Sequence, residues 1–173
     1  RGTLHLVAAQ DVRWVLDLVA PSVIAQSTGR LRQLGIDDIA LRASRAVLEQ
    51  ALSDGGRLTR ADALALLDRA GIETTGQRGI HILRQLSLKG LLVQTVEVGR
   101  QTTFALLDAV VPRAPALSRE EALAELAWRY FSSHGPATVR DFAWWSGLPA
   151  AEARAGTELA ASRLAGERIG DAV

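Results

Sequence analysis

Residues 75–107 constrain the fold more than any other stretch, because the apolar spacing changes there from helical to strand-like. Residues 76–89 have the spacing of an amphipathic helix, and Gly90 is placed to end it. Residues 91–98 and 101–107 then read as two strands that form a hairpin. The stretch therefore predicts a helix followed directly by a β-hairpin. The predicted apolar side of the helix consists of Ile80, Ile82, Leu83 and Leu86.

The opposite side of this helix carries hydrogen-bond donors and no acidic residue. It consists of Gln77, Arg78, His81, Arg84 and Gln85. The hairpin turns at Gly99 and Arg100, so Arg100 and Gln101 lie at its tip. A donor-rich helix before a hairpin with a basic tip is the arrangement with which a winged helix contacts DNA, the helix in the major groove and the hairpin on the backbone or in the minor groove. The alternative is a solvated helix face, or one that packs against a neighbouring unit.

A similar order of elements occurs twice along the chain. Residues 36–112 read as helix, helix, helix, strand, strand, which is the order of a winged-helix unit. Two helix caps of the form T-x-x-D begin at Thr59 and Thr138, and a capping box begins at Ser118. We therefore predict a mainly α fold with small β-hairpins, built from tandem winged-helix units. Residues 36–112 would be a complete unit, and residues 113–173 a second unit that stops before its wing.

Residues 1–35 are predicted to be the remnant of a preceding unit, a strand plus helices, and a linker. Residues 1–7 alternate like a strand. The side of this strand that could meet nucleic acid consists of Arg1, Thr3 and His5. Pro21 is expected to stop or kink a helix over residues 9–19. The chain has no methionine and opens inside a strand pattern, so we expect a piece of a longer protein, whose N- and C-terminal parts would be its partners.

Composition limits the classes of function. The net charge of +1 means that any basic footprint is local, although all but one of the 20 basic residues are arginine. The absence of cysteine excludes disulfides, and three scattered histidines without an HExxH motif argue against zinc, so we expect no cofactor and no metal. No apolar run approaches the roughly 20 residues of a membrane span, and no signal peptide is visible. We expect a cytoplasmic, nucleoid-associated monomer without membrane contact.

Further expectations concern packing. In the helix over residues 36–52, the side chains predicted to face the core are Ile39, Ala43, Val47, Leu48 and Ala51. Trp144 and Trp145 adjoin on one helix and cannot both point inward. We expect Trp145 in the core and Trp144 at the surface, where it would pack against another unit or stack on an unpaired base. A third helix of the second unit is predicted to open at Pro149 and to run to Leu164.

Five segments of the chain carry a family resemblance. They are RGTLHLV (1–7), GQRGIHILRQL (76–86), GRQTTFALLD (99–108), SREEALAELAWRYFSSHGPAT (118–138) and DFAWWSGL (141–148). Together they resemble a bacterial family of DNA-binding proteins built from tandem winged-helix units, which includes alkylpurine and interstrand-crosslink DNA glycosylases. The resemblance covers essentially the whole chain. It implies a scaffold that binds double-stranded DNA and a role in DNA repair.

The family's catalytic motif is not found in this sequence. In the glycosylases that the resemblance points to, the motif is Gln-apolar-Gln or Gln-apolar-Asp, upstream of the strand similar to RGTLHL. No glutamine of this chain is followed two residues later by Gln or Asp, so no catalytic residue can be carried over, and whether the whole protein is an enzyme stays open. The alternative function is a transcription regulator or DNA-architectural protein that uses helix 76–89 and wing 91–107. A third is a protein-interaction scaffold.

Overall fold

The computed structural model describes residues 5–96, 102–113 and 116–166. In this range the fold is mainly helical with one small antiparallel sheet, as predicted. The first elements are η1 (Ala9–Asp11), α1 (Val12–Gln33), α2 (Asp38–Leu52), β1 (Leu58–Thr59), α3 (Arg60–Arg69) and α4 (Arg78–Leu88). They are followed by β2 (Leu92–Val96), β3 (Thr102–Leu106), α5 (Leu107–Val110), α6 (Arg119–His134), α7 (Val139–Ser146), α8 (Ala150–Leu159) and η2 (Ala161–Arg163).

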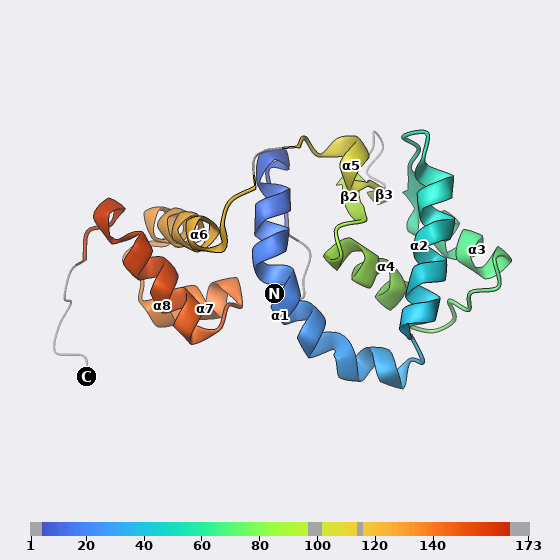
Figure 1. Ribbon diagram of the computed structural model, residues 1–173, viewed down its shortest axis with the longest axis horizontal. Helices are drawn as coiled ribbons and strands as arrows, with labels where there is room; N and C mark the ends of the chain where they lie inside the picture. Colours follow the sequence, from blue (N-terminus) through green and yellow to red (C-terminus); the bar gives the residue numbers. More distant parts are fainter. Residues whose placement is uncertain (1–4, 97–101, 114–115, 167–173) are drawn as a thin grey trace.

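The long helix α1 occupies the middle of the molecule. Figure 1 shows it between the group formed by α2 to α5 with the sheet, and the group formed by α6, α7 and α8. Pro21 was expected to stop or kink the helix, and the stop was wrong, because α1 continues through this residue. A proline removes one helical hydrogen bond and crowds the preceding turn. However, α1 is buried on both sides of it, at Leu18, Val23 and Ser27, and this packing outweighs the local cost.

The N-terminal segment differs from the expected strand. Residues 5–8 have no strand structure, so the strand predicted over residues 1–7 is not formed where the structure describes it. The rest of that prediction, with Arg1 and Thr3, lies outside the described residues.

Three helix starts agree with their predicted caps. The Thr59 hydroxyl accepts from the Asp62 amide at the start of α3. Reciprocal capping boxes begin at Ser118 for α6 and at Thr138 for α7. In each, the side chain of the capping residue and that of the acid three residues later satisfy backbone amides that the helix leaves open.

The first core lies between α2, α3, α4 and the sheet. Its fully buried centre includes Leu48, Leu67 and Ile82. The sheet order is β1-β3-β2, all antiparallel, with Leu92 opposite Leu106 in the predicted β2–β3 hairpin. β1 was not predicted, because two residues are too short to show a period. Its pairing with β3 closes the sheet against the start of α3.

The face that α2 buries agrees with the predicted one at Leu48 and differs from it at Ile39. The buried residues are Leu41, Ser44, Leu48 and Leu52, whereas Ile39 is 68% exposed. The three leucines have more apolar area to bury than the alanines of the predicted face, so they determine which side turns inward.

The second core combines α6, α7 and α8 with the N-terminal half of α1. It contains Leu18 of α1 together with residues of the three later helices, among them Tyr130, Phe142 and Ala153. Trp145, expected in the core, is 36% exposed. The helix expected to reach Leu164 ends at Leu159 and is followed by η2.

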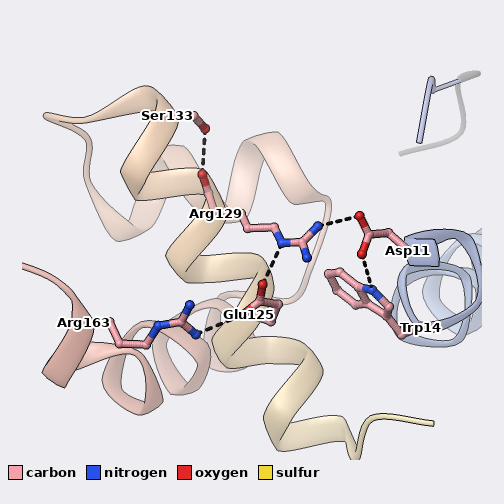
Figure 2. Close-up of polar contacts among 6 residues, drawn as sticks. All are labelled: Asp11, Trp14, Glu125, Arg129, Ser133 and Arg163. Atoms are coloured by element: carbon pink, nitrogen blue, oxygen red, sulfur yellow. Dashed lines mark hydrogen bonds and ion pairs between the residues drawn. The ribbon is translucent and has the colours of Figure 1, made fainter. Parts of the chain in front are cut away.

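A set of charged and aromatic side chains fastens the start of α1 to α6 and η2 (Figure 2). One oxygen of Asp11 accepts from the Arg129 guanidinium at 2.6 Å, and the other accepts from the Trp14 indole at 2.9 Å. Glu125 accepts from both Arg129 and Arg163. We call these five residues the polar clamp. The hydrogen bond from Arg129 holds the pKa of Asp11 below its ordinary value, so the clamp is fully charged at neutral pH.

None of the helices in the described part of the chain is long and apolar enough to cross a membrane.

Candidate nucleic-acid interface

The helix that the sequence singled out, α4, is held closely against α3. Gly79 makes this approach possible: a Cβ placed there would come within 2.5 Å of a Leu64 methyl and 2.8 Å of the Thr74 Cβ. Gly76 precedes the helix with a φ of +60°, a conformation that glycine adopts without strain. The backbone amides of Arg78 and Gly79 donate to the Thr75 and Thr74 carbonyls. A ligand at this end of α4 would therefore meet side chains rather than these amides.

An open hollow of about 570 Å³ lies between the first turns of α3 and α4. Its lining consists of Arg60, Leu64, Gly76, Gln77, Ile80 and His81. None of these residues is acidic, and Arg60 brings a guanidinium from the first position of α3. Ile80 was predicted to face the core but is 46% exposed at the hollow. The hollow therefore combines a positive charge, hydrogen-bonding side chains and an apolar wall.

Arg78, a predicted DNA contact, is committed to the protein's own backbone. Its guanidinium donates to the carbonyls of Leu34 and Gly35, each at 2.6 Å, and to that of Glu73 at 2.9 Å. These bonds tie the start of α4 to the chain that leaves α1. This guanidinium is thus occupied in the free protein.

Gln85, another predicted contact, is buried between α4 and α1. Only 1% of its surface is exposed, and its amide nitrogen donates to the Ser27 hydroxyl at 2.7 Å. Its carbonyl oxygen has no hydrogen-bond partner within the described residues. Gln85 therefore orients α4 against α1 and does not reach the surface.

His81 and Arg84 lie on the part of α4 that remains partly open to solvent. Burial lowers the pKa of His81, and the charges of Arg84 and Arg30 lower it further. The histidine is thus neutral at neutral pH, and its Nδ1 atom is buried without a partner in the described part of the chain. Arg84 is half-buried on this side of α4, and its charge acts on His81.

Arg30 adds a third guanidinium beside α4. It comes from the last turns of α1 and donates to the Gln77 carboxamide oxygen at 2.6 Å and to the Gln33 oxygen at 3.1 Å. Both partners are neutral, so the positive charge of Arg30 is not compensated by these contacts. We call the set Arg30, Arg60, Gln77, His81 and Arg84 the α3–α4 surface.

The remaining predicted contacts are not part of this surface as described. Arg100 and Gln101 at the hairpin tip, and Arg1 and Thr3 at the start of the chain, lie outside the described residues. His5 is exposed.

Sequence reasoning did not single out Arg60, which lines the hollow. Its signal was its place immediately after the cap residue Thr59, which puts it at the exposed start of a helix that packs against α4. Arg30 could not be assigned to the site without knowing that α1 runs unbroken past Pro21. Within the described residues, no group of three or more side chains is arranged to hold a metal ion.

Two comparisons with known proteins gave a match. A family model described as "DNA glycosylase AlkZ-like" matches residues 1–171. Among solved structures, the chain is similar to the DNA glycosylase AlkZ of Streptomyces sahachiroi, with 21% sequence identity and a TM-score of 0.67. The match covers 94% of this chain and 45% of AlkZ, so this chain spans less than half the length of that protein. At this identity the likeness shows a shared fold. A search among curated proteins gave no significant match.

Proposed function

The chain belongs to the AlkZ-like DNA glycosylase family, and on that premise we propose that it binds double-stranded DNA through its α3–α4 surface. In this proposal α2, α3, α4 and the β2–β3 hairpin form a winged-helix unit, with α3 and α4 as its helix-turn-helix. The order of these elements and the antiparallel sheet support that assignment. The role is that of a DNA-repair glycosylase-like protein, and we assign no catalytic residue within this chain.

The charge pattern of the α3–α4 surface carries the proposal. The guanidinium of Arg60 lines the hollow, those of Arg30 and Arg84 act electrostatically on His81 in its wall, and no residue that lines it is acidic. The net charge of the whole chain is only +1, so a surface with three arginines and no acidic residue in the lining of its hollow is a local feature. Such a local surface suits the phosphate backbone of a duplex, which supplies most of the affinity in binding that does not depend on sequence.

The geometry favours contact with the backbone over reading of base edges. Of the donors first expected to read bases, Arg78 and Gln85 are bonded within the protein. Gln77 accepts from Arg30, which leaves its amide nitrogen to donate outward. We expect the guanidiniums of Arg60 and Arg84 to meet phosphates, with Ile80 against the sugar edge.

The test is duplex binding followed by fluorescence anisotropy over a series of salt concentrations. We compare the unaltered chain with the double variant Arg60→Ala/Arg84→Ala. The dependence of log K on log salt should become shallower by about one unit for each lost phosphate contact, equally for unrelated duplex sequences.

Two controls show whether the effect belongs to this surface. Arg42→Ala removes an exposed arginine of α2 that does not line the hollow. Gln85→Met removes a buried carboxamide while keeping its approximate volume. Neither should change the salt slope. If Arg42→Ala weakens binding as much per arginine as the double variant, the binding is diffuse and the assignment of this surface is wrong.

A further inference from the structure

His81 lies in the wall of the hollow between α3 and α4, where three helices contribute guanidiniums. Arg60 lines the hollow from α3, and Arg84 follows His81 by one turn on α4. Arg30 comes from α1 and donates to Gln77, which also lines the hollow. Among the described residues, neither α2 nor the sheet contributes to this lining, and no lining residue is acidic. The charged groups around the His81 ring are therefore guanidiniums.

The buried nitrogen of this ring indicates where its proton lies. His81 Nδ1 and Gln85 Oε1 are the two buried side-chain atoms that lack a hydrogen-bond partner in the described part of the chain. The two residues lie one turn apart on α4, which brings such side chains within reach of each other. The Gln85 amide nitrogen already donates to Ser27, so its oxygen needs a donor. A proton on Nδ1 supplies that donor, directly or through one water, and Nε2 is then the atom that titrates.

The free protein keeps this ring neutral. Burial lowers the pKa of His81, and the charges of Arg84 and Arg30 lower it further. A neutral Nε2 carries a lone pair, which repels the oxygens of a phosphate, whereas the N–H of an imidazolium donates to them. The histidine is thus in the wrong protonation state for the anion that the neighbouring guanidiniums favour.

A bound phosphate would reverse the balance of charge at the ring. Its negative charge favours the imidazolium directly, and it also offsets the guanidiniums that oppose protonation. The Nδ1 proton stays with the Gln85 oxygen, so the added proton goes to Nε2. From there it can donate to a phosphate oxygen.

We propose that the α3–α4 surface binds a DNA phosphate together with one proton, which His81 takes up from the solvent at Nε2. This inference rests on the proposed function, because it assigns a further phosphate contact to the same surface. The bound state holds more protons than the free state, so the affinity rises as the pH falls through the pKa of bound His81. The rise is complete below the pKa of the free histidine. The chain would then bind duplex DNA more tightly at mildly acidic pH than at neutral pH.

The experiment measures duplex binding by anisotropy at constant ionic strength, from about pH 8 to about pH 5.5, a range that includes the ordinary histidine pKa of about 6.5. The unaltered chain is compared with His81→Gln and His134→Gln. Glutamine can donate a hydrogen bond but does not titrate. His134 is the matched control, since it is an exposed histidine at the end of α6 that does not line the hollow. Circular dichroism checks the fold of each variant at each pH.

The quantity compared is the ratio of the affinities at the lowest and highest pH. For the unaltered chain this ratio should be about threefold to tenfold, with a slope of at most about one log unit per pH unit, because one proton is taken up. His81→Gln should remove most of the rise, and His134→Gln should keep it. An equal rise in His81→Gln and in the unaltered chain would overturn the inference.

Calorimetry counts the protons directly. Duplex binding is measured near pH 6.5, the ordinary histidine pKa, in two buffers without phosphate that differ in their heats of ionisation. The difference between the observed heats should correspond to roughly half a proton to one proton taken up by the unaltered chain. His81→Gln should take up close to none. Binding of the unaltered chain without proton uptake would also overturn the inference.

An NMR titration separates failure of this inference from failure of the proposed function. The ring C–H resonance of His81, assigned by its loss in His81→Gln, is followed against pH in sulfate and in chloride of equal ionic strength, since sulfate is an anion that does not titrate in this range. A higher His81 pKa in sulfate, without duplex binding at any pH, would leave the proton-linked anion site standing and refute the duplex proposal. Duplex binding that depends on Arg60 and Arg84 but does not strengthen on acidification would refute the proton uptake alone.

Discussion

Gly156 lies where α8 crosses α6, and replacing it with alanine should open that crossing. A Cβ at this position would lie 2.8 Å from the carbonyl oxygen of Leu123 and 3.2 Å from its carbonyl carbon. These are backbone atoms inside the regular helix α6, so they cannot turn aside as the end of a side chain can. The two helices must move apart to accept the methyl group.

The cost follows from that distance. A carbon and a carbonyl oxygen ordinarily approach to about 3.3–3.6 Å, so the helices must separate by roughly half an ångström. Comparable overpacking in cores costs about 1–3 kcal/mol. Alanine returns about 0.5–1 kcal/mol of helix propensity. We therefore expect Gly156→Ala to lower the free energy of unfolding by about 1–2 kcal/mol.

Gly29 of α1 provides a matched control, because a Cβ there would meet no atom within 4 Å. Gly29→Ala should raise the free energy of unfolding by about 0.5–1 kcal/mol, the propensity effect alone. Both variants are measured by urea unfolding followed by circular dichroism. If Gly156→Ala is as stable as Gly29→Ala, the close crossing of α6 and α8 is not as described, and the reasoning fails.

Three further predictions concern contacts made by α1. Arg78→Ala should destabilise the fold by about 1–3 kcal/mol, because three backbone carbonyls lose their donor, yet at temperatures where the variant is folded its affinity for duplex DNA should stay within about twofold; a large loss of affinity would return Arg78 to the interface. Pro21→Ala should raise the melting temperature of the chain in a calorimetric scan, because it restores a helical hydrogen bond inside α1; a lower value would show that the ring itself is needed for packing. Asp11→Asn should cost about 1–2 kcal/mol at pH 7, a value reduced for the 43% exposure of Arg129. The pKa of Asp11 is depressed in the folded state, so this contribution is complete above the ordinary aspartate pKa of about 4 and is lost as the pH falls through the lower folded value. Urea unfolding over a series of pH values that falls from about 7, with Asp54→Asn as control, should show the difference between Asp11→Asn and the unaltered chain become smaller below the ordinary aspartate pKa.

The sequence predicted those features that depend on neighbours a few residues apart. The helix starts at Thr59, Ser118 and Thr138 need only a hydroxyl and an acid three residues later, and the β2–β3 hairpin needs only its turn and its β-branched strands. Such signals are complete within one segment. The three caps and the pairing of β2 with β3 were confirmed, whereas the turn predicted at Gly99 and Arg100 lies outside the described residues.

Features that depend on distant partners could not be predicted in this way. Gln85 reads as a surface donor, but the Ser27 hydroxyl, 58 residues away, gives it a buried partner. The Arg78 guanidinium likewise donates to the Leu34 carbonyl just after α1, and no pattern of neighbouring residues predicts this bond. Ile80 is exposed because α3 approaches α4 at Gly79 and the apolar side turns toward that contact. The α3–α4 surface is therefore only partly the donor-rich face that helical periodicity indicated.

The position of α1 has a consequence for how such a protein can change over time. Its N-terminal half supplies Leu18 to one core, while Leu31 and Leu34 near its end pack against the other. Recombination cannot delete, duplicate or exchange one of these two halves at the segment between α5 and α6, because α1 would then have one apolar side uncovered. The two halves must be inherited and must evolve together, and a substitution on α1 is tested by selection against both neighbours at once.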